Sequence, residues 1–198
     1  MGLTLSDTQL QQCDEYLLLL DKWNRVHNLT SIQNFDDRVT KHLLDSLTIV
    51  PYLSNHRIID IGSGAGLPGI PLAIYYPNYY FELLDANAKK TAFLDQCRRT
   101  LKLSNITVVH SRVEDYRPEK AFDTIICRAF SDLANIVSKT THLCSNNAII
   151  LAMKGRFPQQ ELEQLVQHGL IYEVHPLTVP GLDAERHVVK ILTGEAGG

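Results

Sequence analysis

The chain has 198 residues, a mass of 22.3 kDa, 44% hydrophobic residues and a formal net charge of −3 at pH 7. This length is enough for one well-filled core, and we expect a single domain over residues 1–198. The net negative charge excludes a general attraction to nucleic acid, so any contact with RNA must use a local basic patch.

The apolar and cysteine patterns exclude further classes of protein. No apolar run in the sequence reaches the 18 residues that a membrane span needs, and the first ten residues lack the pattern of a signal peptide. The four cysteines form no CxxC pair, which predicts neither a disulfide framework nor a structural zinc site. We therefore expect a cytoplasmic protein without a membrane segment or a metal ion.

The first quarter of the chain predicts two helices. One spans Ser6–His27, opens with a capping box and carries an apolar stripe. The second spans Phe35–Val50 and is expected to end at Pro51. These helices would form an N-terminal extension, residues 1–54, in front of a core domain at residues 55–193.

Beyond this extension, short apolar runs alternate with helical segments. The runs cover residues 57–61, 79–85, 106–110, 122–130, 148–153, 171–179 and 186–192, and helices are expected over 69–76, 87–101, 131–143 and 158–168. This alternation, with apolar runs rich in β-branched residues, predicts an α/β fold with a mostly parallel seven-stranded sheet and helices on both faces. Only a loop separates the last two runs, which predicts an antiparallel hairpin at one edge.

A glycine-rich stretch, "RIIDIGSGAGLPGIP", includes the first of these strands. Gly64, Gly66 and Gly69 match the dinucleotide fingerprint G-x-G-x-x-G, and Asp85 follows where such folds place an acid on a ribose hydroxyl. Glycines between a strand and a helix let the backbone approach a ligand and offer it unpaired N–H groups. A dinucleotide and S-adenosylmethionine both fit this loop, and a purely structural turn is a third alternative.

Three features favour S-adenosylmethionine over a nicotinamide dinucleotide. Asp60 lies two residues before Gly62, which gives the pattern D-x-G-x-G-x-G at the strand end. The chain is too short for a cofactor domain and a separate substrate domain of usual size. The terminal antiparallel hairpin is foreign to dinucleotide-binding sheets. An NAD(P)-dependent oxidoreductase remains as the alternative enzyme.

Several longer motifs occur in a fixed order between Lys22 and Leu192. They are "KWNRVHNLTS", "HLLDS", "IIDIGSGAGLPGIPLAI", "ELLDANAKKTAFL", "SRVED", "ICRAF", "MKG" and "ERHVV". Together they resemble the bacterial ribosomal RNA small subunit methyltransferase G family, formerly called glucose-inhibited division protein B. The resemblance implies a class I methyltransferase fold, Rossmann-like. It also implies methyl transfer from S-adenosylmethionine to N7 of a specific guanine in 16S rRNA, with S-adenosylhomocysteine as the second product.

The resemblance also implies a set of cofactor contacts. They are Gly62, Gly64, Gly66, Leu67, Asp85, Val113, Glu114 and Arg128. Asp85 would accept hydrogen bonds from the ribose hydroxyls, and Val113 with Glu114 would flank the adenine. A helix N-cap is the alternative role for Asp85, and a solvated carboxylate is the alternative for Glu114.

The chemistry explains why no catalytic side chain is expected. Guanine N7 carries a lone pair and no proton, so it attacks the methyl group without a general base, and catalysis rests on positioning. Positive charge moves toward the base during the reaction, which argues for binding rather than chemistry as the role of Arg128. Cys127 is expected to be a buried strand residue and not a nucleophile.

RNA contact is expected at basic and polar residues near the strand ends. In A-form RNA, N7 lies in a groove too deep and narrow for side chains, so the target guanine must sit in a loop or leave its stack. The expected substrate-binding residues are Asn28, His42, Lys154, Arg156 and Arg186. The expected partner is the 16S rRNA or the small ribosomal subunit, with the protein as a monomer. A non-catalytic RNA-binding assembly factor is a further alternative.

Overall fold

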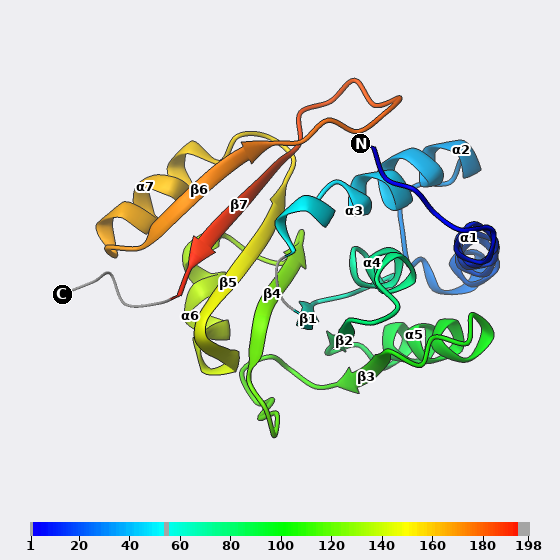
Figure 1. Ribbon diagram of the computed structural model, residues 1–198, viewed down its shortest axis with the longest axis horizontal. Helices are drawn as coiled ribbons and strands as arrows, with labels where there is room; N and C mark the ends of the chain where they lie inside the picture. Colours follow the sequence, from blue (N-terminus) through cyan, green and yellow to red (C-terminus); the bar gives the residue numbers. More distant parts are fainter. Residues whose placement is uncertain (1, 54–55, 194–198) are drawn as a thin grey trace.

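The computed structural model describes residues 2–53 and 56–193, and within them a seven-stranded sheet forms the centre of the molecule (Figure 1). Its strands are β1 (Arg57–Ile61), β2 (Tyr80–Asp85), β3 (Ile106–His110), β4 (Phe122–Arg128), β5 (Cys144–Lys154), β6 (Ile171–Pro176) and β7 (His187–Leu192). Their order is β3-β2-β1-β4-β5-β7-β6. Strands β1 to β5 are parallel, whereas β7 runs antiparallel to β5 and β6. The expected α/β fold with an antiparallel edge hairpin is confirmed.

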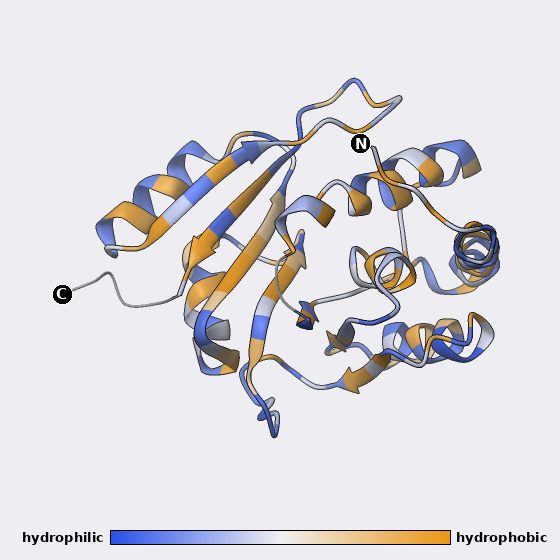
Figure 2. Cartoon of the chain, in the orientation of Figure 1, coloured by the Kyte–Doolittle hydropathy of each residue, from blue (hydrophilic) through white to orange (hydrophobic). Residues whose placement is uncertain are grey.

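Helices cover both faces of this sheet. On one face lie α1 (Asp7–His27), α4 (Gly69–Tyr75) and α5 (Ala88–Thr100), and on the other lie α6 (Leu133–Thr140) and α7 (Gln159–Gln167). Ile58 of β1 belongs to the first core cluster, and Ile59 and Ile61 belong to the second. Full burial of each such side chain contributes about 1.5–3 kcal/mol. Figure 2 shows apolar residues concentrated along the central strands β4 and β5.

Helix α1 connects the N-terminal extension to the glycine loop. Ser6 caps the helix through the expected capping box with Gln9. The fully buried Tyr16 packs its ring on Phe93 of α5, and its hydroxyl donates a hydrogen bond of 2.7 Å to the carbonyl oxygen of Ala65. The extension therefore holds the backbone of the loop that follows β1.

The second helix differs from the sequence-based prediction of one helix over Phe35–Val50. It consists of α2 (Phe35–Arg38), a π-helical segment η1 (Val39–Leu44) and α3 (Asp45–Leu47), followed by a 3-10 turn η2 (Val50–Tyr52). The helix ends at Leu47, where the Thr48 hydroxyl donates to the Asp45 carbonyl at 2.6 Å. Pro51 lies inside η2 and does not end the helix, because its fixed φ suits a first helical turn. A π-helical segment inside a helix often marks a functional site.

Two other boundaries also differ. The helix expected over residues 131–143 begins only after Asp132, whose carboxylate accepts the Asn135 N–H at 2.9 Å, and it ends in a 3-10 turn η3 (Thr141–Leu143). Strand β5 begins at Cys144 and not at residue 148. Within the described ranges, no helix has the length and apolar character needed to cross a bilayer.

Candidate active site

Three pockets lie at the carboxyl ends of the parallel strands, the edge at which doubly wound sheets bind ligands. The β2–β3 pocket, about 190 Å³, is lined by Ile61, Gly62, Leu84–Ala86, Ser111–Glu114, Phe130 and Lys139. The glycine-loop pocket, about 340 Å³, is lined by Leu29–Ile32, His42, Gly62–Ala65, Leu67, Lys90, Arg128 and Ala129. The arginine pocket, about 280 Å³, is lined by Asp45, Arg128, Ala129, Met153–Gly155, Leu177, Arg186 and His187.

The glycines of the loop have different tasks. Gly62 has a φ of +68°, and a Cβ atom there would lie 2.7 Å from Cδ2 of Phe130. Glycine therefore fits best at this position, which borders both the β2–β3 pocket and the glycine-loop pocket. Gly66 has a φ of +86°, but its missing side chain makes room for Ile70, whose Cδ1 would lie 2.4 Å from a Cβ atom. Gly66 therefore supports helix packing and lines none of the three pockets. Gly64 and Leu67 line the glycine-loop pocket, as expected of cofactor contacts.

The buried Asp60 stabilises the glycine loop through hydrogen bonds. Its Oδ2 accepts a hydrogen bond of 2.9 Å from the N–H of Gly69, and the Ser63 hydroxyl donates to its carbonyl oxygen at 2.9 Å. The carboxyl group is fully buried, and Oδ1 has no hydrogen-bond partner among the described residues. This burial raises the pKa of Asp60 to about 7. The acid that distinguishes the sequence pattern thus fixes the start of α4.

Asp85 joins the loop to the next helix. Its Oδ2 accepts the Gly64 N–H at 2.9 Å, its Oδ1 accepts the Asn87 N–H at 2.8 Å, and the Lys90 ammonium lies 3.8 Å away. The N-cap of α5 is Asn87, so the alternative role of Asp85 as the cap is wrong. An ionised carboxylate has about four acceptor sites, and Asp85 uses two of them for backbone N–H groups while it lines the β2–β3 pocket.

The remaining walls of the β2–β3 pocket combine apolar and charged groups. Val113 is buried and Phe130 packs beside it in the same core cluster. Glu114 is paired with Lys139 at 2.7 Å, and this hydrogen bond lowers the pKa of Glu114. Both side chains are well exposed, so the pair itself contributes little stability.

Arg128 lies between the other two pockets and is held by Asp45. Its Nη1 is 3.1 Å from Asp45 Oδ2, an ion pair without hydrogen-bond geometry, and Arg186 Nε donates to Asp45 Oδ1 at 2.9 Å. The Asp45 side chain is 2% exposed, whereas both arginines are about one quarter exposed. One buried carboxylate from the N-terminal extension therefore positions two arginines of the core.

Ala129 follows the end of β4 at Arg128, which lies two residues before the predicted strand end at residue 130. Its φ of +52° is uncommon for a residue with a side chain and is found most often at functional sites. The turn sends the neighbouring side chains to different places: Arg128 lines the glycine-loop and arginine pockets, and Phe130 lines the β2–β3 pocket. The preceding Cys127 is buried, and burial raises the pKa of its thiol to about 12, so the thiol stays protonated.

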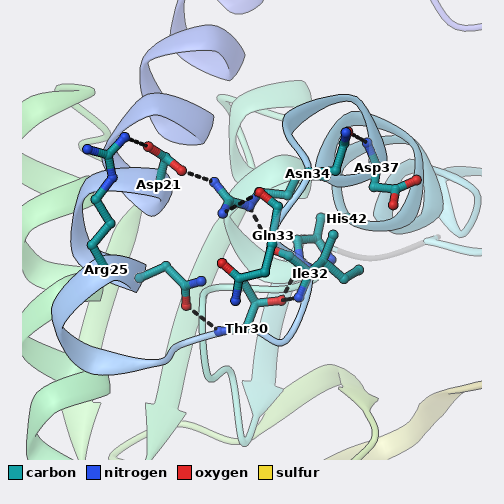
Figure 3. Close-up of polar contacts among 10 residues, drawn as sticks. Asp21, Arg25, Thr30, Ile32, Gln33, Asn34, Asp37 and His42 are labelled. Carbon is teal, nitrogen blue, oxygen red and sulfur yellow. Dashed lines mark hydrogen bonds and ion pairs between the residues drawn. The ribbon is translucent and has the colours of Figure 1, made fainter.

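His42 of η1 belongs to a network that fixes the segment after α1 (Figure 3). The Thr30 N–H donates to Asn24 Oδ1 at 2.8 Å, and the Ile32 N–H donates to Thr30 Oγ1 at 3.1 Å. Thr30 Oγ1 lies 2.8 Å from His42 Nε2, and His42 Nδ1 lies 3.1 Å from the Lys41 carbonyl. These contacts fit one tautomer, in which Nδ1–H donates to the carbonyl and Nε2 accepts the Thr30 hydroxyl.

The surroundings of His42 keep its imidazole neutral. Burial, reinforced by the nearby positive charge of Arg128, lowers the pKa of His42 to about 4. Arg38 fixes the same segment from the other side: its guanidinium pairs with Asp21 at 2.6 Å and donates to two backbone carbonyls of the segment (Figure 3). His42 therefore supports the wall of the glycine-loop pocket as a neutral, hydrogen-bonded side chain.

Of the other residues expected to bind substrate, some line the arginine pocket and some line none of the three pockets. Arg186 lines the arginine pocket, and Lys154 lines it too but is paired with Glu161 at 2.7 Å. Arg156 is exposed and makes no ion pair with the described part of the chain. Asn28 lines none of the three pockets: it is the left-handed C-cap of α1, with a φ of 48°.

Sequence reasoning missed several residues of the site. Asp45 has no place in the predictions above, although it lies in the motif "HLLDS". Phe130 lies in "ICRAF", and Thr30 lies in "KWNRVHNLTS", so these motifs contain the signals that would have found them. Lys90 lies in "ELLDANAKKTAFL", whereas Lys139 lies in none of the motifs. Within residues 2–53 and 56–193, no three metal-ligating side chains converge.

A glycine loop after β1, an acid at the end of β2 and this strand order define the class I S-adenosylmethionine-dependent methyltransferases. The fold is shared with a SAM dependent methyltransferase from Aquifex aeolicus at a TM-score of 0.61 and 16% identity, covering 79% of this chain and 93% of that one.

Sequence comparison gives the particular family. The family model for rRNA small subunit methyltransferase G matches residues 9–189. Ribosomal RNA small subunit methyltransferase G of Nitrosococcus oceani is 52% identical over 197 residues, which cover 100% of this chain and 92% of that protein. The protein of the same name from Laribacter hongkongensis is 49% identical, covering 96% and 92%. The chain belongs to the rRNA small subunit methyltransferase G family and is an S-adenosylmethionine-dependent methyltransferase.

Proposed function

We propose that this enzyme transfers the methyl group of S-adenosylmethionine to N7 of a specific guanine in the 16S rRNA of the small ribosomal subunit. The observation that carries the proposal is that neighbouring pockets share lining residues. Gly62 lines both the β2–β3 and the glycine-loop pocket, and Arg128 with Ala129 lines both the glycine-loop and the arginine pocket. A cofactor in the first two pockets would meet a base presented from the third.

The residues of the first two pockets fit the cofactor. Asp85 keeps acceptor sites for the ribose hydroxyls, and Val113 with Glu114 would hold the adenine. At Gly62 the ring of Phe130 packs where a Cβ atom would lie, so a side chain there would displace one wall of the β2–β3 pocket. Gly64 and Leu67 would contact the methionine part, while Gly66 acts through the loop. The bound sulfonium supplies an activated methyl group and leaves as S-adenosylhomocysteine.

The chain's own contribution to the reaction is positioning and charge. Guanine N7 attacks without losing a proton, so no general base is needed. The methylated base is cationic, and an isolated arginine beside it would be unfavourable. Asp45 reduces this problem because its carboxylate lies 3.1 Å from Arg128, although the same carboxylate also pairs with Arg186. Arg128 would therefore bind or orient the substrate, with Asp45 weakening its repulsion of the charge that develops on the base.

The arginine pocket supports the choice of RNA as substrate. Arg186 and Lys154 line it, and Arg156 is exposed next to it in the chain. Lys154 is already paired with Glu161 and Arg186 with Asp45, so Arg156 is the cation of this set without an ion pair among the described residues. His42 would act by shaping the glycine-loop pocket, and Asn28 by fixing the start of the segment that lines it. These charges form the local patch that an acidic protein needs for RNA.

The proposal includes the unit that acts. Residues 1–54 and 55–193 would work as one domain, since Asp45 of the first part holds arginines of the second. We propose that the enzyme acts as a monomer, with all three pockets contributed by one chain, and in the cytoplasm, where its ribosomal substrate lies.

A methyl-transfer assay tests this function. Tritium-labelled S-adenosylmethionine is offered with 16S rRNA and with small subunits from cells lacking the enzyme, and borohydride–aniline cleavage locates 7-methylguanine. Label at one guanine N7 supports the proposal, and Asp85→Asn should reduce it by weakening cofactor binding. Cofactor binding without transfer would favour an assembly factor. Thermal stabilisation by NAD but not by S-adenosylmethionine would favour an oxidoreductase.

A further inference from the structure

An exposed aromatic ring contacts the wall of the arginine pocket and has no part in the functions described above. Phe157 follows Gly155 and Arg156 in the loop between β5 and α7, and 48% of it is exposed. Its ring packs edge-on against His187, with 5.5 Å between ring centroids and 81° between ring planes. His187 itself lines the arginine pocket, so Phe157 packs on one of the residues that form the wall of this pocket.

The position of Phe157 is fixed by its surroundings. The antiparallel register pairs Lys154 of β5 with His187 of β7, and His187 Nδ1–H donates to the Gly155 carbonyl at 3.2 Å. The next residue, Pro158, is buried and restricts Phe157 to extended conformations. The flat apolar face of Phe157 is therefore exposed in a fixed position. Aromatic rings of this kind are more often buried inside a protein.

The charged residues near Phe157 indicate which kind of ligand binds its exposed ring. Arg156, which is exposed, directly precedes Phe157 in the loop, and Arg186, which lines the arginine pocket, directly precedes His187. An aromatic face among arginines is the arrangement by which proteins bind unpaired nucleotides, with bases on the ring and phosphates on the cations. A purely apolar protein partner would leave the exposed Arg156, which has no ion-pair partner among the described residues, without a counter-charge, whereas Asp45 already pairs with Arg186.

We propose that Phe157, supported edge-on by His187, is a stacking platform for an unpaired rRNA base beside the target guanine. The inference rests on the function proposed above and adds a second nucleotide to it. A guanine that enters the pocket has left its stack, and its neighbour then has an exposed face that Phe157 covers. Stacking does not discriminate among the bases, so the platform would contribute affinity and position more than sequence specificity.

The test compares substitutions at Phe157 in the full-length enzyme. Phe157→Ala should raise KM for rRNA by about ten- to a hundredfold, the range that loss of one stacked base produces, with a smaller change in kcat. Phe157→Trp should preserve KM, whereas Phe157→Leu, which keeps the apolar bulk but no aromatic face, should resemble the alanine variant. Val166→Ala, at an exposed apolar residue of α7 that lines none of the three pockets, is the matched control and should leave KM unchanged.

The outcomes separate this proposal from the function on which it rests. Calorimetry should give the same Kd for S-adenosylmethionine in all variants, because Phe157 lines neither cofactor pocket. If the wild-type enzyme methylates rRNA and Phe157→Ala has an unchanged KM, the platform is wrong and the function stands. If the wild-type enzyme transfers nothing, the function itself fails. A loss seen only with assembled subunits and not with naked 16S rRNA would show that the ring meets a ribosomal protein, which also overturns the proposal.

Discussion

Asp45 and Arg186 lie 141 residues apart in the sequence, and their side chains meet at 2.9 Å beside the candidate substrate pocket. Asp45 comes from α3 of the N-terminal extension, and Arg186 directly precedes the edge strand β7. The same carboxylate pairs with Arg128 at the end of β4. A single buried acid thus fixes the relative positions of three parts of the chain.

Asp45→Asn should therefore affect stability and substrate binding together. Removing one partner of a buried ion pair usually costs about 3–5 kcal/mol. We expect the lower end of this range or less, because both arginines can reach solvent. KM for rRNA should also rise as the arginines lose their fixed positions. Urea denaturation gives the stability change, and Asp37→Asn, which breaks the exposed pair with Lys41, is the control with an expected change below about 1 kcal/mol. Equal losses in the two variants would contradict the prediction.

Gly62→Ala and Gly64→Ala should differ in cofactor binding although both glycines have positive φ. Alanine costs about 1–2 kcal/mol in this backbone conformation at either site. Only at residue 62 does the new methyl group also collide with Phe130, which lines the β2–β3 pocket. We expect Gly62→Ala to weaken S-adenosylmethionine binding by at least about tenfold more than Gly64→Ala, measured by calorimetry. Similar affinities would show that Phe130 yields freely.

The sequence predicted the regular parts of the molecule and missed what depends on distant contacts. Strand β1 and its glycine loop were predicted because apolar runs and glycine spacing are local patterns. The break in the helix over Phe35–Val50 was missed: His42 and Asp45 have good helical spacing, and their partners Thr30 and Arg186 are invisible to periodicity. The pattern D-x-G-x-G-x-G likewise could not separate Gly66, which makes room for Ile70, from Gly62, which lines two of the pockets.

Asp60 should make the folded state less stable as the pH rises. Its pKa in the folded protein is about 7, against an ordinary value of 3.8, so between these values the folded state holds one proton more than the unfolded chain. Stability contributed by this group is present at low pH and is lost as the pH rises toward 7. Asp60→Asn, which keeps an acceptor for the Gly69 N–H, should remove this loss. The measurement is the free energy of unfolding from urea titrations at several pH values.

His42 should have the opposite effect in an overlapping range. Its pKa is lowered from 6.5 to about 4, so between these values the unfolded chain holds the extra proton, and stability is lost as the pH falls. From about pH 4 to 6.5 the two groups offset each other, and the wild-type protein should show little net slope from them. Asp60→Asn should expose the His42 slope, with stability rising by up to about 1.4 kcal/mol per pH unit. His42→Gln should expose the Asp60 slope, of opposite sign. If Asp60→Asn and His42→Gln both changed stability with pH in the same direction, the protonation state assigned to Asp60 or to His42 would be wrong.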